Sequence, residues 1–138
     1  MECEIVSCIL KSEGFALALR LRVFEEDMSH PVNATMKVEV QSEGFSGQAD
    51  MDIDVRAFVS FAADCNALYG KLHGTAEICE SIGDMKLTFR GDGRGYIHVS
   101  GQLSDGWNAL TFRNAVDQTS MRGFCVQLNA ACEACPTK

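Results

Sequence analysis

Apolar and polar residues alternate along several short segments of this chain. In FALALRLRV (15–23) every second side chain is apolar, and the same alternation occurs in ATMKVEV (34–40) and YIHVSGQL (96–103). A period of two is typical of a strand that buries one face and leaves the other in water. The chain is therefore expected to be built largely from antiparallel hairpins.

Shorter or less regular segments extend this strand pattern. In FSGQADMDI (45–53), the alternation places Phe45 and the other apolar residues on one face and the aspartates on the opposite face. Further strands are expected at Glu4–Leu10, Thr75–Cys79, Met85–Phe89 and Trp107–Val116. Together these segments predict about eight antiparallel strands.

One segment in the middle of the chain changes to the helical period. Apolar residues recur three and four positions apart from Val55 to Leu72, as on the buried face of an amphipathic helix. Asp54 is a natural N-cap for this helix, and Gly74 is a natural stop.

A second helical stripe follows the last strand segment. Asp117 or Thr119 is expected to cap this helix, and Pro136 is expected to end it. Residues 1–74 and residues 75–135 then each read as four strands and a helix, a possible ββββα pseudo-repeat within a single domain of residues 1–138. The stripe comprises Met121, Phe124, Cys125, Leu128 and Cys132.

The expected fold class is α+β, with the two helices packed on one apolar face of the antiparallel sheet. The side chains expected in the core are Leu17, Leu19, Leu21, Val38, Phe58, Phe61, Leu68, Leu87, Phe89, Val99, Leu110, Phe112, Phe124 and Leu128.

Short glycine motifs separate the strand segments. SEGF occurs at Ser12–Phe15 and again at Ser42–Phe45, and the similar SDGW occurs at Ser104–Trp107. We interpret all three as hairpin turns in which Gly supplies the positive φ and the aromatic residue opens the return strand; a ligand motif used three times is the less favoured interpretation. GDGRG (91–95) and IGD (82–84) are expected to be hairpin loops too. GDGRG opens no helix and so lacks the dipole of a phosphate-binding loop.

The charge balance restricts the partners of this chain. The sequence carries 12 basic and 19 acidic residues, for a net charge of −7. A chain this acidic is expected to repel nucleic acid and to attract a basic partner. No apolar run approaches the roughly 20 residues of a membrane span. The segment MECEIVSC (1–8) does not resemble a secretory signal, and the seven cysteines show no disulfide-framework spacing. A cytoplasmic location is therefore expected.

Few residues have the spacing expected of a metal site or a catalytic site. Cys132-x-x-Cys135 has no second Cys pair to complete a zinc site, and it closes a helix rather than opening one. His98 has no nucleophile or carboxylate near it in a known catalytic arrangement. DMDID (50–54) does not match a calcium loop. We therefore expect no metal, no cofactor and no catalytic residue, so the chain is not expected to be an enzyme.

The second half of the chain resembles a known family. Its LTF strand (87–89), its G-x-I-x-V-x-G strand (95–101) and its L-T-F…DQT…F…L passage (110–128) resemble WapI-type bacterial immunity proteins. The resemblance covers about Phe58–Leu128. It implies a small cytosolic protein that catalyses nothing and blocks the toxic C-terminal domain of a contact-delivered polymorphic toxin, often a nuclease. It carries over no toxin-contacting residue, because such surfaces differ between cognate pairs.

Two hypotheses for function remain from the sequence. The first is an immunity protein whose acidic surface meets a basic toxin domain, with Glu25, Glu43, Asp50 and Asp52 as candidate contacts. The alternative is a small-molecule or carbohydrate binding module that uses Tyr96, His98 and Trp107 on the polar face of the sheet.

Overall fold

The computed structural model describes residues 2–4 and 7–135. Within these ranges the chain forms nine strands, two α-helices and two short 3₁₀ helices, so the predicted α+β class is confirmed. The strands are β1 (Glu2–Glu4), β2 (Cys8–Ser12), β3 (Phe15–Phe24), β4 (Ala34–Ser42), β5 (Phe45–Ile53), β6 (His73–Cys79), β7 (Lys86–Asp92), β8 (Tyr96–Asp105) and β9 (Asn108–Asp117). The helices are α1 (Val55–Lys71) and α2 (Met121–Ala134), with η1 (Glu25–Asp27) and η2 (Gln118–Ser120).

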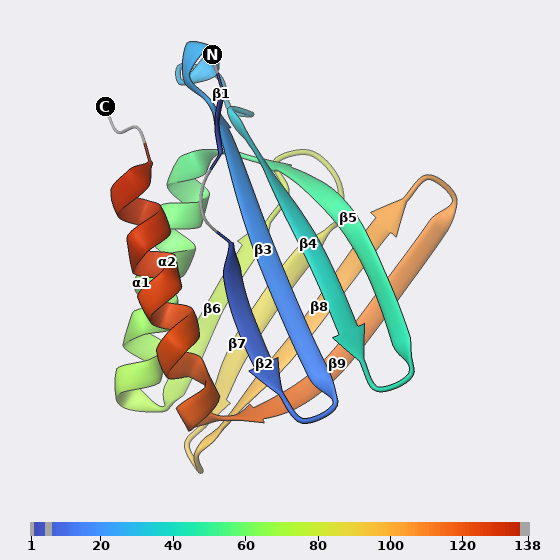
Figure 1. Cartoon of the computed structure of the whole chain (residues 1–138), viewed down its shortest axis with the longest axis vertical. Helices are drawn as coiled ribbons and strands as arrows, with labels where there is room; N and C mark the ends of the chain where they lie inside the picture. The colour runs from blue at the N-terminus through green and yellow to red at the C-terminus, as the bar shows by residue number, and fades with distance from the viewer. Residues whose placement is uncertain (1, 5–6, 136–138) are drawn as a thin grey trace.

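The strands divide between two antiparallel sheets. In the first sheet β3 pairs with β4 and β4 with β5, while β1 and β2 both pair with β3; the second sheet has the order β6-β7-β8-β9. Figure 1 shows the two sheets one behind the other with their strands crossing, and both helices along one side. There α2 contacts β2, and α1 contacts β6. The helices thus pack against the apolar space between two sheets, a division that the sequence pattern does not specify.

The alternation predicted from the sequence sets the buried face of each sheet. On β3, the side chains of Phe15, Leu17, Leu19, Leu21 and Val23 are all buried. The predicted strand Glu4–Leu10 is instead β1 and β2, with residues 5 and 6 outside the described residues. The alternation places Phe45 on the apolar face of β5, but it is 73% exposed at the first position of the strand, next to the hairpin turn.

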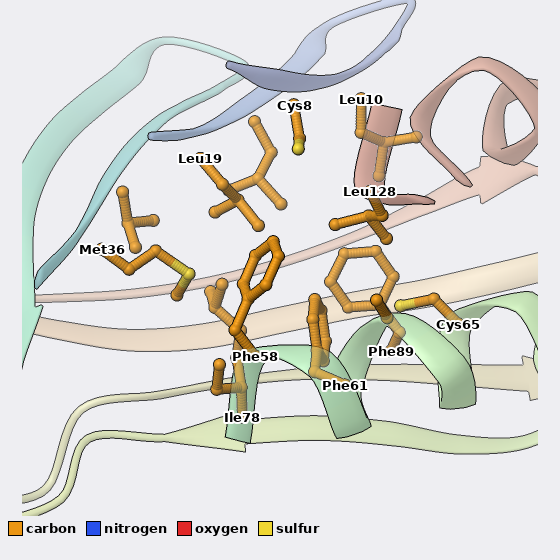
Figure 2. Close-up of a cluster of buried hydrophobic side chains, with 14 of the residues drawn as sticks. Cys8, Leu10, Leu19, Met36, Phe58, Phe61, Cys65, Ile78, Phe89 and Leu128 are labelled. Carbon is orange, nitrogen blue, oxygen red and sulfur yellow. The ribbon is translucent and has the colours of Figure 1, made fainter. Parts of the chain in front are cut away.

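Aromatic rings from both helices meet the second sheet at the centre of the core. The ring of Phe89 on β7 stacks on Phe124 of α2 with centroids 5.6 Å apart. The same ring packs edge-on against Phe61 of α1 at 5.5 Å. Figure 2 shows Phe61 and Phe89 close to Leu128 and Cys65. Of the core residues predicted from the sequence, all are buried except Leu110, which is partly buried where the two sheets cross.

The ends of α1 follow from local chemistry, with one correction. The Asp54 carboxylate accepts from Arg56 N at 3.0 Å and caps the helix as predicted. The predicted stop at Gly74 is wrong, because Leu72 ends the helix in the left-handed region (φ 67°) and its N–H donates to Leu68 O at 2.7 Å. Gly74 lies inside β6. A non-glycine residue in the left-handed region is uncommon, so the sequence favours Gly74 over Leu72 as the end of the helix.

The start of α2 also differs from prediction. Asp117 accepts from Thr119 N at 2.9 Å, but this cap belongs to η2, which precedes α2. Ser120 stands at the N-cap of α2 and makes no side-chain cap bond. Pro136, the predicted end of this helix, lies outside the described residues.

The three similar motifs form hairpin tips, but their backbones differ. Gly14 (φ 75°) and Gly106 (φ 64°) supply the positive φ in the first and third turns. In the second turn the positive φ falls on Glu43 (φ 56°) instead of on Gly44. In the third, Asp105 pairs with Asn108, so Trp107 lies in the turn and does not open β9. The first two turns touch each other, because Glu43 N donates to Gly14 O at 2.7 Å.

Candidate functional site

The four acidic candidates lie in separate places. Glu43 is in the β4–β5 turn, whereas Glu25 is in η1 at the far end of the same sheet. The nine residues of β4 run between these ends, a length of about 30 Å. Asp50 and Asp52 are on the outward face of β5.

Asp50 and Asp52 face polar and cationic neighbours across the sheet. Asp50 stands opposite Lys37 in the register, and Asp52 accepts from the Thr35 hydroxyl at 3.2 Å. A hollow of about 170 Å³ beside them is lined by Arg20, Leu21, Arg22, Thr35, Lys37 and Asp50. This outward face therefore carries mixed charge and does not form a continuous acidic surface.

Tyr96, His98 and Trp107 do not come together. Tyr96 and His98 are near the start of β8, whereas Trp107 is in the turn that follows its end, about 30 Å away by strand length. His98 Nε2 is 3.3 Å from Asp92 Oδ2. Hydrogen bonds to Asp92, first from Arg94 N and then from His98, lower the pKa of that carboxyl. Trp107 is fully exposed.

The main concave feature between the sheets is a groove beside the outer edge of β9. We call it the seam groove: a hollow of about 350 Å³ lined by Val40, Ser42, Glu43, Phe45, Leu110, Thr111, Phe112 and Arg113. Four consecutive residues of β9 line it, so the groove meets the strand edge-on. Its opposite wall is the β4–β5 hairpin, which crosses the second sheet in Figure 1.

A second hollow, of about 280 Å³, adjoins the seam groove. It is lined by Ser46, Gly47 and Gln48 of β5 and by Leu103, Ser104, Asp105, Asn108, Ala109 and Leu110 of the β8–β9 hairpin. Leu110 borders both hollows, and a Cβ added at Gly47 would lie 2.9 Å from Leu110 Cδ2. The missing side chain at Gly47 therefore allows β5 to cross closely over β9.

Asn114 links the two walls of the seam groove near Arg113. Its Nδ2 donates to the Ser42 hydroxyl at 3.0 Å, and its Oδ1 accepts from Ala115 N at 2.9 Å. Sequence reasoning missed Phe45, Leu110 and Asn114 as surface features, because alternation assigns them to the inner face and does not show where that face ends.

A broad hollow of about 430 Å³ lies on the outward face of the first sheet. It forms over Ala16 and Ala18, where small side chains leave room between Ile9, Glu39 and Gln48. Neither charge nor aromatic residues converge here, so the seam groove is the better candidate surface.

The buried thiols are poorly suited to nucleophilic chemistry. Burial, followed by the nearby Cys132 and Cys135, raises the pKa of Cys8 to about 12. Burial raises the pKa of Cys125 to about 11 and that of Cys65 well above its ordinary value. Across the described part of the chain, no three His, Cys, Asp or Glu residues are grouped to hold a metal ion. Neither described helix is long and apolar enough to cross a membrane.

Comparison with models of known protein families identifies a family for this chain. The family model described as the immunity protein WapI-like family matches residues 8–136. The matched range includes β2 and continues through both sheets and both α-helices. No curated protein matches the chain.

Proposed function

The chain belongs to the WapI-like immunity protein family, and from that premise we propose that it binds a cognate toxin domain and neutralises it without catalysis. The observation that carries the proposal is the extent of the family match, which includes nearly the whole chain. The groove and the aromatic side chains between the two sheets support a protein-binding role.

The proposed partner is a basic toxin domain, with a nuclease as the specific candidate. The net charge of −7 supports this, because opposite charges on two proteins speed their encounter and favour the correct partner. The proposed location is the cytoplasm, where seven cysteines without disulfide spacing would remain as thiols.

The test is co-expression with the toxin domain encoded by the neighbouring gene. A tag on this protein should retain the toxin domain during purification, and cells that produce both should grow where cells that produce the toxin domain alone do not. An inactivated toxin domain should still be retained, which separates binding from protection. If the domain is toxic but is neither retained nor neutralised, the proposed function is wrong.

The alternative of a small-molecule or carbohydrate module gains no support from the geometry. Its three candidate side chains, Tyr96, His98 and Trp107, lie at opposite ends of β8 and line no common cavity among the hollows described above.

A further inference from the structure

We propose that the outer edge of β9 binds an extended, basic segment of the toxin domain as an additional strand. The inference rests on the proposed function and specifies the surface and the kind of segment it takes. A strand added to a sheet edge gains main-chain hydrogen bonds for affinity and side-chain pockets for specificity.

The register shows which backbone groups β9 offers. Gln118 N donates to Gly95 O at 2.9 Å, so Gly95 and Gln118 form a hydrogen-bonded pair. This pair lies one position beyond the pair of Tyr96 and Asp117 in the register of β8 and β9. Hydrogen-bonded and non-hydrogen-bonded pairs alternate in an antiparallel ladder. The N–H and C=O groups of Ala109, Thr111 and Arg113 therefore point away from β8, toward the seam groove and the adjoining hollow.

Parts of the other sheet edges are covered, whereas among the described residues no bond from another element reaches the backbone of β9 between Ala109 and Arg113. At the edge of β2, Ile9 N donates to Gln127 Oε1 of α2 at 2.6 Å. At the edge of β5, Asp52 O accepts from Ser81 N at 2.8 Å, and β6 lies against α1. Proteins usually cover or blunt such edges, because an open edge pairs with other chains. Among the described residues no strand pairs with the outer edge of β9.

The side chains beside this edge suit an apolar side chain of the incoming strand. Phe45, Leu110 and Phe112 supply apolar side chains to the lining of the seam groove. Its volume of about 350 Å³ has room for a few side chains. Trp107, which is fully exposed, stands just before the edge and could cover the end of an added strand.

The charges at this edge favour a basic segment. Glu43 lines the seam groove, and Glu13 lies in the adjacent turn, since Glu43 N is bonded to Gly14 O. Asp105 lines the adjoining hollow. Arg113 is the single cation of the groove lining. Three carboxylates against one guanidinium match the positive charge proposed for the toxin domain.

A single substitution separates backbone pairing from other contacts. Thr111→Pro removes an N–H that points away from β8, so the β8–β9 ladder keeps its bonds. We expect it to weaken binding of the co-purified toxin domain by about tenfold or more. Thr111→Ala keeps the N–H and should weaken binding much less than Thr111→Pro does. Thr75→Pro is the matched control, because its N–H also points outward, at the opposite edge of the same sheet on β6; it should bind normally.

Hydrogen exchange on the parent protein gives a second measurement that needs no variant. The amides of Thr111 and Arg113 should exchange quickly in the protein alone and slowly in the complex. A complex that forms while these amides stay unprotected, or that tolerates a folded Thr111→Pro, overturns strand addition and leaves the proposed function standing. Protection that grows with concentration of this protein alone would make a second copy the occupant and also overturn it. No retention of the toxin domain by the parent protein removes both proposals.

Discussion

The side chain of Asn33 fixes the start of α1, because its Oδ1 accepts from the backbone N–H of Val55 at 2.7 Å. Its Nδ2 donates to His30 O at 3.0 Å and to Asp54 Oδ1 at 3.2 Å. One amide thus joins the η1 loop, the helix cap and the first turn of the helix. Among the described residues Asn33 is the one buried polar side chain, with no exposed surface.

Replacing this amide should be costly. Asn33→Ala leaves the buried Val55 N–H without its acceptor, and an unsatisfied buried group costs about 1–3 kcal/mol. Urea denaturation should show a loss of that size. Asn66→Ala is the control, because the two bonds it removes between Asn66 and Asn129 are exposed and its remaining bond, to Ala62 O, lies within α1; it should change the free energy of unfolding by less than Asn33→Ala does.

Two glycines should respond oppositely to alanine. A Cβ at Gly101 would lie 2.4 Å from Phe112 Cε1, so Gly101→Ala should destabilise the protein by about 1–3 kcal/mol through overpacking. Gly123 is inside α2 and has nothing within 4 Å of an added Cβ. Gly123→Ala should stabilise by about 0.5–1 kcal/mol. Thermal and urea unfolding of both variants check the pair, and equal effects at the two sites would contradict the packing described for Phe112.

Asp54 should make stability depend on acid pH. The Arg56 guanidinium, which donates to this carboxylate, lowers the pKa of Asp54 from 3.8 to about 2. Since the folded state lowers this pKa, the stabilisation is complete above 3.8 and is lost as pH falls toward about 2. Asp54→Asn keeps a cap acceptor but has no charge to titrate. Its free energy of unfolding should change less than that of the parent protein between these two pH values, and parallel curves would contradict the assignment.

Thiol alkylation should follow burial. Cys79 is exposed, whereas Cys65 and Cys125 are buried and have raised pKa values. The thiolate is the reactive form, so iodoacetamide at pH 8 should modify Cys79 well before the other two. Mass spectrometry of the native protein over time, with the urea-unfolded protein as control, measures the order. Early modification of Cys65 in the native protein would argue against its burial beneath α2.

The sequence predicts which face of each strand is buried but not which strands share a sheet. Alternation identifies Leu17, Leu19 and Leu21 as core residues because period-two burial is local. The division into two crossed sheets depends on contacts far apart in the chain, such as Gly47 against Leu110. The sequence also did not predict the positive φ angles of Glu43 and Leu72, because this backbone conformation is usually adopted by glycine.

The candidate surface was hidden from the sequence for a related reason. Charge alone pointed to Asp50 and Asp52, whose outward strand positions were predicted correctly, but their neighbours Lys37 and Thr35 are set by the pairing with β4. The edge of β9 carries ordinary residues such as Ala109 and Thr111. This edge is exposed because no strand among the described residues pairs with it. The alternation of apolar and polar residues does not show which strand lies at the edge of a sheet.

The bond between Ile9 and Gln127 spans 118 residues, which has a consequence during synthesis. At ordinary elongation rates a ribosome needs roughly ten seconds to add a stretch of that length. During that interval β2 can already pair with β3, but Gln127 has not yet been synthesised, so the outer edge of β2 is uncovered. A nascent chain stalled before α2 would therefore expose the outer edge of β2 in addition to that of β9, and chaperone capture should be strongest at that stage.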